Sequence, residues 1–326
     1  MKIAMYGSGA AGSVFASYLR AGGADMILID RYKEHMDKVA KDGMNFTIHL
    51  QEGGEYKDIV RQLTGFTTYT NAADCGIVDV IIFMTKATQL EQAILDAQPC
   101  IGPDTVAVSL INGLGNDDTL LRHFPANRCV IGSGVLGTAL TAPGACVSTP
   151  SGDVQMNFGA IERSELTDKA CETMLKYYRD GGCDAYWRKD DIYYYVWKKV
   201  LVNATVNTVC AALRLKICYV AEDPYGYSLF EQVVREAAAV ATARGTKIDA
   251  DDFLEHDLAD IITNIGDYYP SMCQDMLMHK RQTEISVLNA KIAEYGEQLG
   301  VPTPTNAVLS KIISCIQNNY DNQYKD

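Results

Sequence analysis

Residues 2–30 read KIAMYGSGAAGSVFASYLRAGGADMILID, and this stretch decides the fold. The apolar run Lys2–Tyr6 predicts a short strand that leads into a glycine-rich turn at residues 7–12. The amphipathic pattern after the turn predicts a helix to about Ala21, and Met26–Ile29 predicts a second strand that ends at Asp30. A strand, a GxGxxG turn, a helix and a second strand in this order predict a dinucleotide-binding βαβ unit.

The glycine-rich turn is the first candidate binding site. The first glycine permits a tight turn, the second lets the backbone approach a pyrophosphate, and the third allows close packing of the helix. The helix N-terminus adds N–H groups and the positive end of a dipole. We therefore expect the turn to bind a dinucleotide through Gly7, Ser8, Gly9, Ala10, Ala11 and Gly12.

The two residues after the second strand bear on the choice of cofactor. Asp30 lies 18 residues after Gly12, where a carboxylate accepts hydrogen bonds from the ribose hydroxyls and repels a 2′-phosphate, which favours NAD(H). Arg31 points the other way, because a guanidinium after the acid is the group that holds a 2′-phosphate in NADP enzymes. The alternative for Arg31 is a solvated surface charge. The pattern leans to NAD and leaves NADP open.

Strands and helices continue to alternate after Asp30, which predicts an α/β Rossmann domain with a doubly wound parallel sheet. Lys86 and Asn112 each follow a predicted strand, at the carboxyl edge where open α/β sheets bind ligands. The predicted strands are 78–84, 105–110 and 129–131, the predicted helices are 89–97, 117–124 and 165–180, and a hairpin-like pair of strands is expected within 145–158.

A second polar pattern lies inside the apolar run VWKKVLVNATVNTVCAAL, residues 196–213. At 100° per helical residue, Lys199, Asn203 and Asn207 fall within about 80° of one another on one helix face. Burying an unpaired polar group costs about 1–3 kcal/mol, so this polar stripe needs partners, either a polar ligand or a structural network. Lys198 shares its face with Val202 and Val206, and we expect its ammonium to reach water.

Composition limits the classes of function. The 326 residues, 48% of them hydrophobic, suggest two domains: residues 1–188, and an all-α domain over 189–326. The net charge of −12 and the lack of a long basic run argue against nucleic acid. The ten cysteines form no CxxC pair and the five histidines are isolated, so we expect free thiols and no metal site. No apolar run reaches transmembrane length, so we expect no membrane association and a cytoplasmic location.

The chain resembles the ketopantoate reductase family, which comprises 2-dehydropantoate 2-reductases and related D-2-hydroxyacid dehydrogenases. The resemblance covers nearly the whole chain, and its motifs follow in order. The matching pieces are GSGAAG at 7–12, TKATQ at 85–89, NGLG at 112–115, WKKVLVNATVN at 197–207, PSMCQD at 270–275, TEI at 283–285 and GVPTPTN at 300–306.

The resemblance implies a Rossmann domain followed by an all-helical domain, with the active site in the cleft between them. It makes Lys199 the general acid that protonates a 2-oxo acid carbonyl, and burial should lower its pKa toward working pH. The family pattern assigns substrate contacts to Asn112, Asn203, Asn207 and Ser271. It assigns cofactor contacts to Lys86, Asn112, Thr138 and Glu284. It also implies that the product is used in pantothenate biosynthesis. It leaves a homodimer open.

Some positions depart from the family pattern. Lys216-Ile217-Cys218 and Tyr268 stand where ketopantoate-reducing members carry asparagines, and NADPH-using members usually have a small residue in place of Asp30. The interval from Asp275 to Glu284 is one residue longer than usual, which on a continuous helix would rotate Glu284 by about 100°.

Two alternatives to a 2-oxo acid reductase stay open. One is a 3-hydroxyacid dehydrogenase, whose catalytic lysine also precedes an asparagine, although residues 192–197 lack the glycine-rich stretch of that group. The other is a non-catalytic dinucleotide sensor. A sensor needs no proton donor, so Lys199 together with two amides favours an enzyme.

Overall fold

The computed structural model describes residues 1–52, 55–150 and 154–323. The chain divides into two compact units. The first comprises Met1–Asn112 and Asn116–Ile192, and the second comprises Gly113–Gly115 and Tyr193–Asp326. A short piece of the N-terminal half therefore belongs to the second, helical unit.

The first unit is built on an eight-stranded sheet with the order β12-β11-β8-β7-β6-β1-β2-β5. In this order, the six neighbouring strands β8, β7, β6, β1, β2 and β5 run parallel to one another, and β11 runs antiparallel to β8. This confirms the expected Rossmann architecture. The strands are β1 (Lys2–Tyr6), β2 (Asp25–Ile29), β5 (Thr67–Tyr69), β6 (Val78–Phe83), β7 (Ile101–Ser109), β8 (Cys129–Gly134), β11 (Met156–Ala160) and β12 (Ala185–Trp187).

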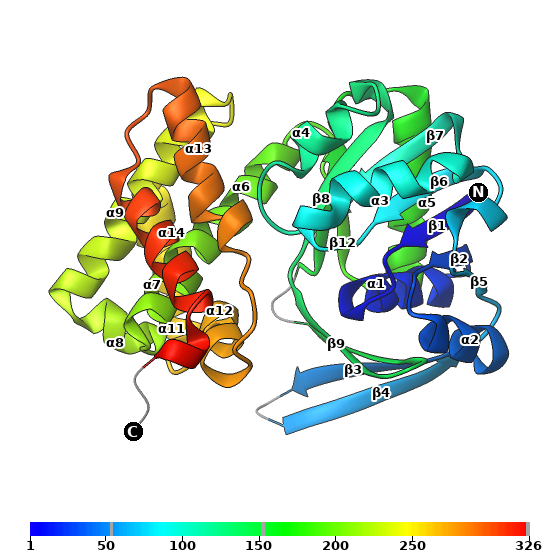
Figure 1. The fold of residues 1–326 in the computed structure, drawn as a ribbon, viewed down its shortest axis with the longest axis horizontal. Helices are drawn as coiled ribbons and strands as arrows, with labels where there is room; N and C mark the ends of the chain where they lie inside the picture. Colours follow the sequence, from blue (N-terminus) through cyan, green and yellow to red (C-terminus); the bar gives the residue numbers. More distant parts are fainter. Residues whose placement is uncertain (53–54, 151–153, 324–326) are drawn as a thin grey trace. The chain divides into compact units, whose positions relative to one another are not determined.

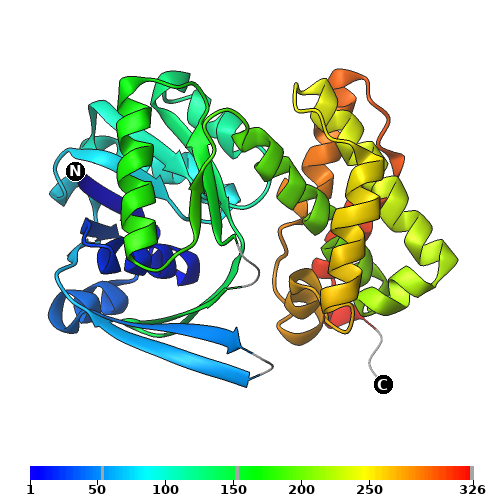
Figure 2. The same cartoon turned by 180° about the vertical axis from the view of Figure 1, so that it is seen from behind.

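Helices cover both faces of this sheet because its strands are apolar on both sides. Helices α1 (Ala10–Ala21) and α5 (Glu165–Asp180) cover one face, and α3 (Leu90–Ala97) and α4 (Asn116–Leu121) cover the other (Figures 1 and 2). Helix α2 (Lys33–Asp42) lies against β5. The topology reverses between β1 and β6, so the carboxyl ends of these two strands mark the ligand-binding edge.

A second, four-stranded sheet packs on α1 and was not expected from the sequence. Its order is β4-β3-β10-β9, with β3 (Met44–Glu52), β4 (Glu55–Leu63), β9 (Leu136–Ala142) and β10 (Ala145–Pro150). Tyr18 of α1 contacts Phe46 edge-on at 4.8 Å between ring centroids, and its hydroxyl lies 2.9 Å from Ser148 Oγ. The expected hairpin within 145–158 is wrong, because β10 pairs with β9 while β11 pairs with β8.

The second unit is helical, as expected. Buried aliphatic side chains of α7, α9, α13 and α14 form its core. Its main elements are α6 (Ile192–Val202), α7 (Thr208–Leu213), α8 (Ile217–Glu222), α9 (Pro224–Ala243), α10 (Ala250–Asp252), α11 (Ala259–Ile265), α12 (Ser271–Cys273), α13 (Asn289–Leu299) and α14 (Pro304–Gln317), with π-helical turns at Asn203–Asn207, Phe253–Leu258 and Gln274–Met278. Among the described residues of both units, no helix combines the length and apolar character that crossing a bilayer requires.

Candidate active site

The backbone of the glycine-rich turn depends on its glycines. Gly7 adopts φ +93°, and a Cβ there would lie 2.8 Å from the carbonyl oxygen of Met84. A Cβ on Gly12 would lie 1.9 Å from the carbonyl oxygen of Gly7, so α1 can approach β1 only with glycine at this position. Gly9 precedes α1 without a side-chain cap and has open space around its Cβ position. The space beside Gly7 and Gly12 is therefore filled by backbone, whereas the space beside Gly9 is open. This arrangement is the one expected of a dinucleotide-binding turn.

Asp30 braces this turn. Its Oδ2 accepts a hydrogen bond from the backbone N–H of Ser8 at 2.6 Å, and its Oδ1 accepts one from the N–H of Tyr32 at 2.8 Å. The sequence pattern assigned Asp30 to the ribose alone. The structure adds a second role for Asp30, which is to hold the backbone of the turn. Each carboxylate oxygen can accept more than one hydrogen bond, so this role leaves acceptor capacity for the ribose hydroxyls.

A pocket of about 220 Å³ lies at the carboxyl ends of β1, β2 and β6. Its wall includes Gly7, Asp30, Arg31 and Asp96. Arg31 forms an ion pair with Asp96, whose other carboxylate oxygen accepts a hydrogen bond from Gln92 at 2.7 Å. The side chain of Arg31 is 78% exposed but already engaged by a carboxylate. The Arg31 guanidinium is therefore paired with a carboxylate of the same pocket wall, while most of its side chain stays exposed to solvent.

A buried cluster behind the turn was missed from the sequence, where His35 stood as an isolated histidine. His35 is fully buried, and its Nδ1 accepts a hydrogen bond from the backbone N–H of Gly144 at 2.9 Å. Its Nε2 lies 3.2 Å from Ser13 Oγ and 3.4 Å from Ser8 Oγ. Burial lowers the pKa of His35 and the Asp30 charge opposes this. A neutral imidazole thus joins the turn to the second sheet.

The other expected cofactor residues fall in two places. Phe83 of β6 pairs with Ser109 of β7, and Lys86 and Asn112 each lie three residues beyond this pair, at the same edge of the large sheet. The Asn112 carbonyl accepts a hydrogen bond from the side-chain amide of Asn116 at 3.3 Å. Thr138 lies instead on β9, opposite Ser148 in the smaller sheet.

The polar stripe of the second unit contains a break in the α-helix. Helix α6 ends at Val202, and Asn203–Asn207 form a π-helical turn before α7 begins. Four residues of an α-helix overshoot a full turn by 40°, whereas the wider π turn advances less per residue. Asn207 is therefore turned back toward the line of Lys199, and all three stripe residues are partly exposed. The stripe is better aligned than an uninterrupted α-helix would make it.

Ser271 and Glu284 join the stripe within the same unit. The side-chain amide of Asn207 donates a hydrogen bond to Ser271 Oγ at 3.2 Å. The Glu284 charge acts on Lys199 and raises its pKa. The expected 100° rotation of Glu284 does not arise, because residues 279–284 are not helical, and Lys280 has φ +47°. This irregular segment absorbs the additional residue.

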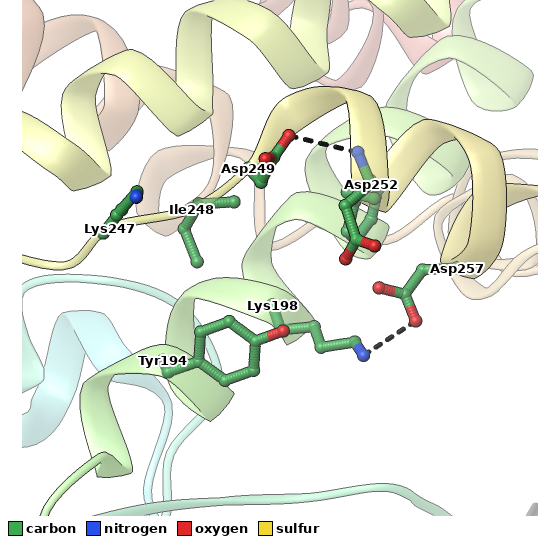
Figure 3. Close-up of a pocket in the computed structure, with 8 residues that line it drawn as sticks. Tyr194, Lys198, Lys247, Ile248, Asp249, Asp252 and Asp257 are labelled. Carbon is green, nitrogen blue, oxygen red and sulfur yellow. Dashed lines mark hydrogen bonds and ion pairs between the residues drawn. The ribbon is translucent and has the colours of Figure 1, made fainter.

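Two neighbouring lysines have opposite environments. Burial lowers the pKa of Lys199 to about 8, and Glu284 only partly offsets this. Lys198 pairs with Asp257 at 2.7 Å in a pocket of about 210 Å³ that also includes Tyr194 and Lys247 (Figure 3). Burial lowers the pKa of Lys198, but the Asp257 carboxylate outweighs it and the net shift is upward. The Lys198 side chain is 37% exposed, so it reaches water as expected, and the structure adds the carboxylate of Asp257 as its partner.

The positions that depart from the family pattern lie next to each other. The backbone N–H of Ile217 donates to the Tyr268 carbonyl at 3.4 Å, and Lys216 pairs with Asp267 at 2.5 Å. The Tyr268 hydroxyl accepts a hydrogen bond from Gln274 at 2.7 Å. Both departures therefore alter one region, close in sequence to Ser271.

Comparison with known proteins agrees with this geometry. The family model for the N-terminal part, ketopantoate reductase PanE/ApbA, matches residues 3–163, and the model for the C-terminal part, ketopantoate reductase PanE/ApbA C terminal, matches residues 191–317. The 2-dehydropantoate 2-reductase of Lactococcus lactis is 28% identical over 96% of this chain and 97% of its own. That of Pyrococcus horikoshii is 28% identical over 96% of each chain.

A solved structure extends the comparison to a second activity. The ternary structure of D-mandelate dehydrogenase with NADH and anilino(oxo)acetate is 28% identical, covers 98% of this chain and 99% of its own, and has a TM-score of 0.81. The relatives are thus oxidoreductases, and one of them binds NADH. The two family models together match most of the chain, and the glycine-rich turn and the stripe around Lys199 agree with them. This chain therefore belongs to the ketopantoate reductase family.

Proposed function

We propose that this protein is a nicotinamide-dependent reductase that converts a 2-oxo acid into a D-2-hydroxy acid, with Lys199 as the proton donor. The observation that carries the proposal is the environment of Lys199. Burial brings its pKa to about 8, and Asn203 and Asn207 share its helix face with Ser271 hydrogen-bonded to Asn207. An ammonium of this acidity can donate a proton at neutral pH.

Each residue then has a stated task. The bound cofactor supplies a hydride to the carbonyl carbon, and negative charge develops on the carbonyl oxygen. The Lys199 ammonium donates a hydrogen bond to that oxygen and then the proton. The Asn203 and Asn207 amides and the Ser271 hydroxyl orient the substrate, and Glu284 keeps the Lys199 pKa from falling further. The glycine-rich turn, Lys86, Asn112 and Thr138 hold the dinucleotide.

We assign NADH as the preferred cofactor. Asp30 and Asp96 both line the pocket beyond β2, and Asp96 pairs with Arg31. A 2′-phosphate there would approach two carboxylates, and Arg31 would have to be shared with Asp96 to hold it. The D-mandelate dehydrogenase relative, which was solved with NADH, supports the same choice. Asp30→Ala should shift the NADH to NADPH ratio of kcat/KM by roughly tenfold toward NADPH. Asp96→Asn should shift it in the same direction, because it releases Arg31. An unchanged ratio in both variants contradicts the assignment.

The substrate is best sought by steady-state assays of a panel of 2-oxo acids with NADH and with NADPH. The panel should include 2-dehydropantoate and aromatic 2-oxo acids, because the relatives carry both activities in their names. The departures at Lys216–Cys218 and Tyr268 weaken the case for 2-dehydropantoate itself, which is why the panel extends to other branched and aromatic acids. Turnover of at least one acid is the expected result.

Two other outcomes would replace the proposal. If NADH binds by calorimetry and no oxo acid is reduced, the protein is a dinucleotide sensor. If a 3-hydroxy acid is oxidised while every 2-hydroxy acid is inert, it is a 3-hydroxyacid dehydrogenase.

A further inference from the structure

The π-helical turn at Asn203–Asn207 disrupts the regular backbone bonding of the helix. In an α-helix the N–H of Thr208 would donate to the carbonyl of Ala204, four residues earlier. Here the N–H of Thr208 donates to the carbonyl of Thr205 instead. The Ala204 carbonyl lies in a buried part of the unit, where loss of its α-helical bond has to be compensated.

Asn289, the first residue of α13, supplies that compensation. Its side-chain amide donates a hydrogen bond to the Ala204 carbonyl at 2.9 Å, and its Oδ1 accepts one from Thr208 Oγ1 at 2.7 Å. Asn289 and Thr208 are both fully buried. One side chain therefore binds Ala204 within the π turn and Thr208 directly after it, from a position 81 residues beyond Thr208.

The orientation of Asn289 is itself fixed by a buried network. Its amide also donates to Asn306 Oδ1 at 3.0 Å, and the Asn306 amide donates to Glu236 Oε2 at 2.8 Å. The Glu236 carboxylate further accepts the backbone N–H groups of Thr305 and Asn306, both at 2.9 Å, at the start of α14. With every polar atom of its amide engaged, Asn289 cannot flip without breaking several bonds.

From this geometry we infer that Asn289 and Thr208 are positioning residues, which fix the π turn and thereby align Asn203 and Asn207 with Lys199. The inference rests on the proposed function for its kinetic consequence, because the aligned amides are the groups assigned to the substrate. Its structural part, the clamp on the π turn, stands on the contacts alone. Neither residue belongs to the machinery that touches the substrate or the cofactor.

The test compares three variants that each change one heavy atom of a side chain, with Asn289→Leu as a fourth. Thr208→Val removes only the hydroxyl that donates to Asn289, Thr208→Ser keeps the hydroxyl, and Ser310→Ala removes a buried hydroxyl of α14 that bonds to Ala307 and does not contact the turn. We expect Thr208→Val to raise KM for the oxo acid roughly tenfold while KM for NADH stays constant. Thr208→Ser and Ser310→Ala should keep the wild-type value. Asn289→Leu, if it folds, should exceed the effect of Thr208→Val.

Hydrogen exchange of the segment 200–213 gives a readout that needs no turnover. We expect faster exchange there in Thr208→Val and wild-type rates in Ser310→Ala. If the wild type reduces no oxo acid but Thr208→Val still accelerates this exchange, the clamp holds and the proposed function fails. Unchanged exchange in Thr208→Val overturns the clamp. Equal rises of both KM values, matched by Ser310→Ala, show general destabilisation and also overturn it.

Discussion

The glycine-rich turn of the first unit and the π turn of the second solve the same problem in different ways. In the proposed function, both present polar groups to a ligand at a point where regular structure is interrupted. In the first, the groups are backbone N–H donors, and the geometry follows from Gly7 and Gly12, which lack a Cβ. In the second, the groups are the side chains of Lys199, Asn203 and Asn207, and the geometry depends on a distant asparagine.

This difference determines how each site fails. A site made of backbone is damaged by adding an atom, because the space behind the turn is already filled. A site made of side chains is damaged by removing an atom, either from the reacting group or from the network that holds it. The following experiments test this contrast.

The largest effect should come from the reacting group itself. Lys199→Ala removes the proposed proton donor, and general acid catalysis contributes about 10²- to 10⁴-fold, so kcat should fall by that factor. NADH affinity by calorimetry should stay constant. Lys198→Ala is the matched control, because Lys198 is one residue away but pairs with Asp257. Comparable losses in both variants would show that Lys199 has no special role.

The turn offers a pair of glycines for the opposite test. Gly12→Ala places a Cβ 1.9 Å from the Gly7 carbonyl oxygen, whereas the Cβ position of Gly9 has no neighbour within 4 Å. Overpacking costs about 1–3 kcal/mol, so Gly12→Ala should lower Tm and weaken NADH binding up to about a hundredfold. Gly9→Ala should leave Tm unchanged and weaken NADH binding only. A Tm drop in Gly9→Ala of the same size as in Gly12→Ala would contradict this account of the turn.

The pH dependence tests the charge state of the stripe. The acid form of Lys199 is needed for reduction and the neutral form for the reverse oxidation. With a pKa of about 8, reduction should be constant below pH 8 and fall tenfold per unit above it, while oxidation should rise through the same range. Glu284→Gln removes a charge that raises this pKa, so the midpoint should move below 8. An upward movement would place Glu284 in another role.

The smallest effect should come from the edge of the stripe. Ser271→Ala removes a hydroxyl that accepts one hydrogen bond from Asn207 and is exposed to solvent. One such bond contributes about 0.5–1.5 kcal/mol, so KM for the oxo acid should rise about two- to tenfold with kcat nearly constant. Ser271→Thr keeps the hydroxyl and should restore the wild-type KM. Loss of kcat in Ser271→Ala would instead assign Ser271 to the chemical step.

Local patterns predicted the parts of the fold that local physics determines. The strand, turn, helix and strand from Lys2 to Ile29 lie within one residue of their expected bounds, because glycine positions and apolar periodicity fix them. The four-stranded sheet was missed although two of its pairings, β3 with β4 and β9 with β10, are local hairpins. The pairing that joins the two hairpins into one sheet is distant in sequence. Strand β10 has β3 as one neighbour, about a hundred residues earlier, and local alternation cannot reveal such a partner.

The same limit applies to the candidate site. The helical spacing of Lys199, Asn203 and Asn207 was visible in the sequence, and so was the acid after β2. The π turn, the pairing of Arg31 with Asp96 and that of Lys198 with Asp257 were not, since each depends on a residue from another element. Asn289 carried no local signal beyond being a polar residue at the start of an amphipathic helix.

The assignment of Gly113–Gly115 to the helical unit has a practical consequence for dissecting the protein. The N–H of Leu114 donates to the Val287 carbonyl at 2.9 Å, and its side chain is 7% exposed within the helical core. A Cβ on Gly113 would lie 2.5 Å from Val287 Cγ2. A fragment starting at Tyr193, or a chimera that exchanges only the C-terminal sequence with a homologue, therefore lacks or mismatches one piece of its own interior. A chimera should therefore exchange residues 113–115 together with the C-terminal helices.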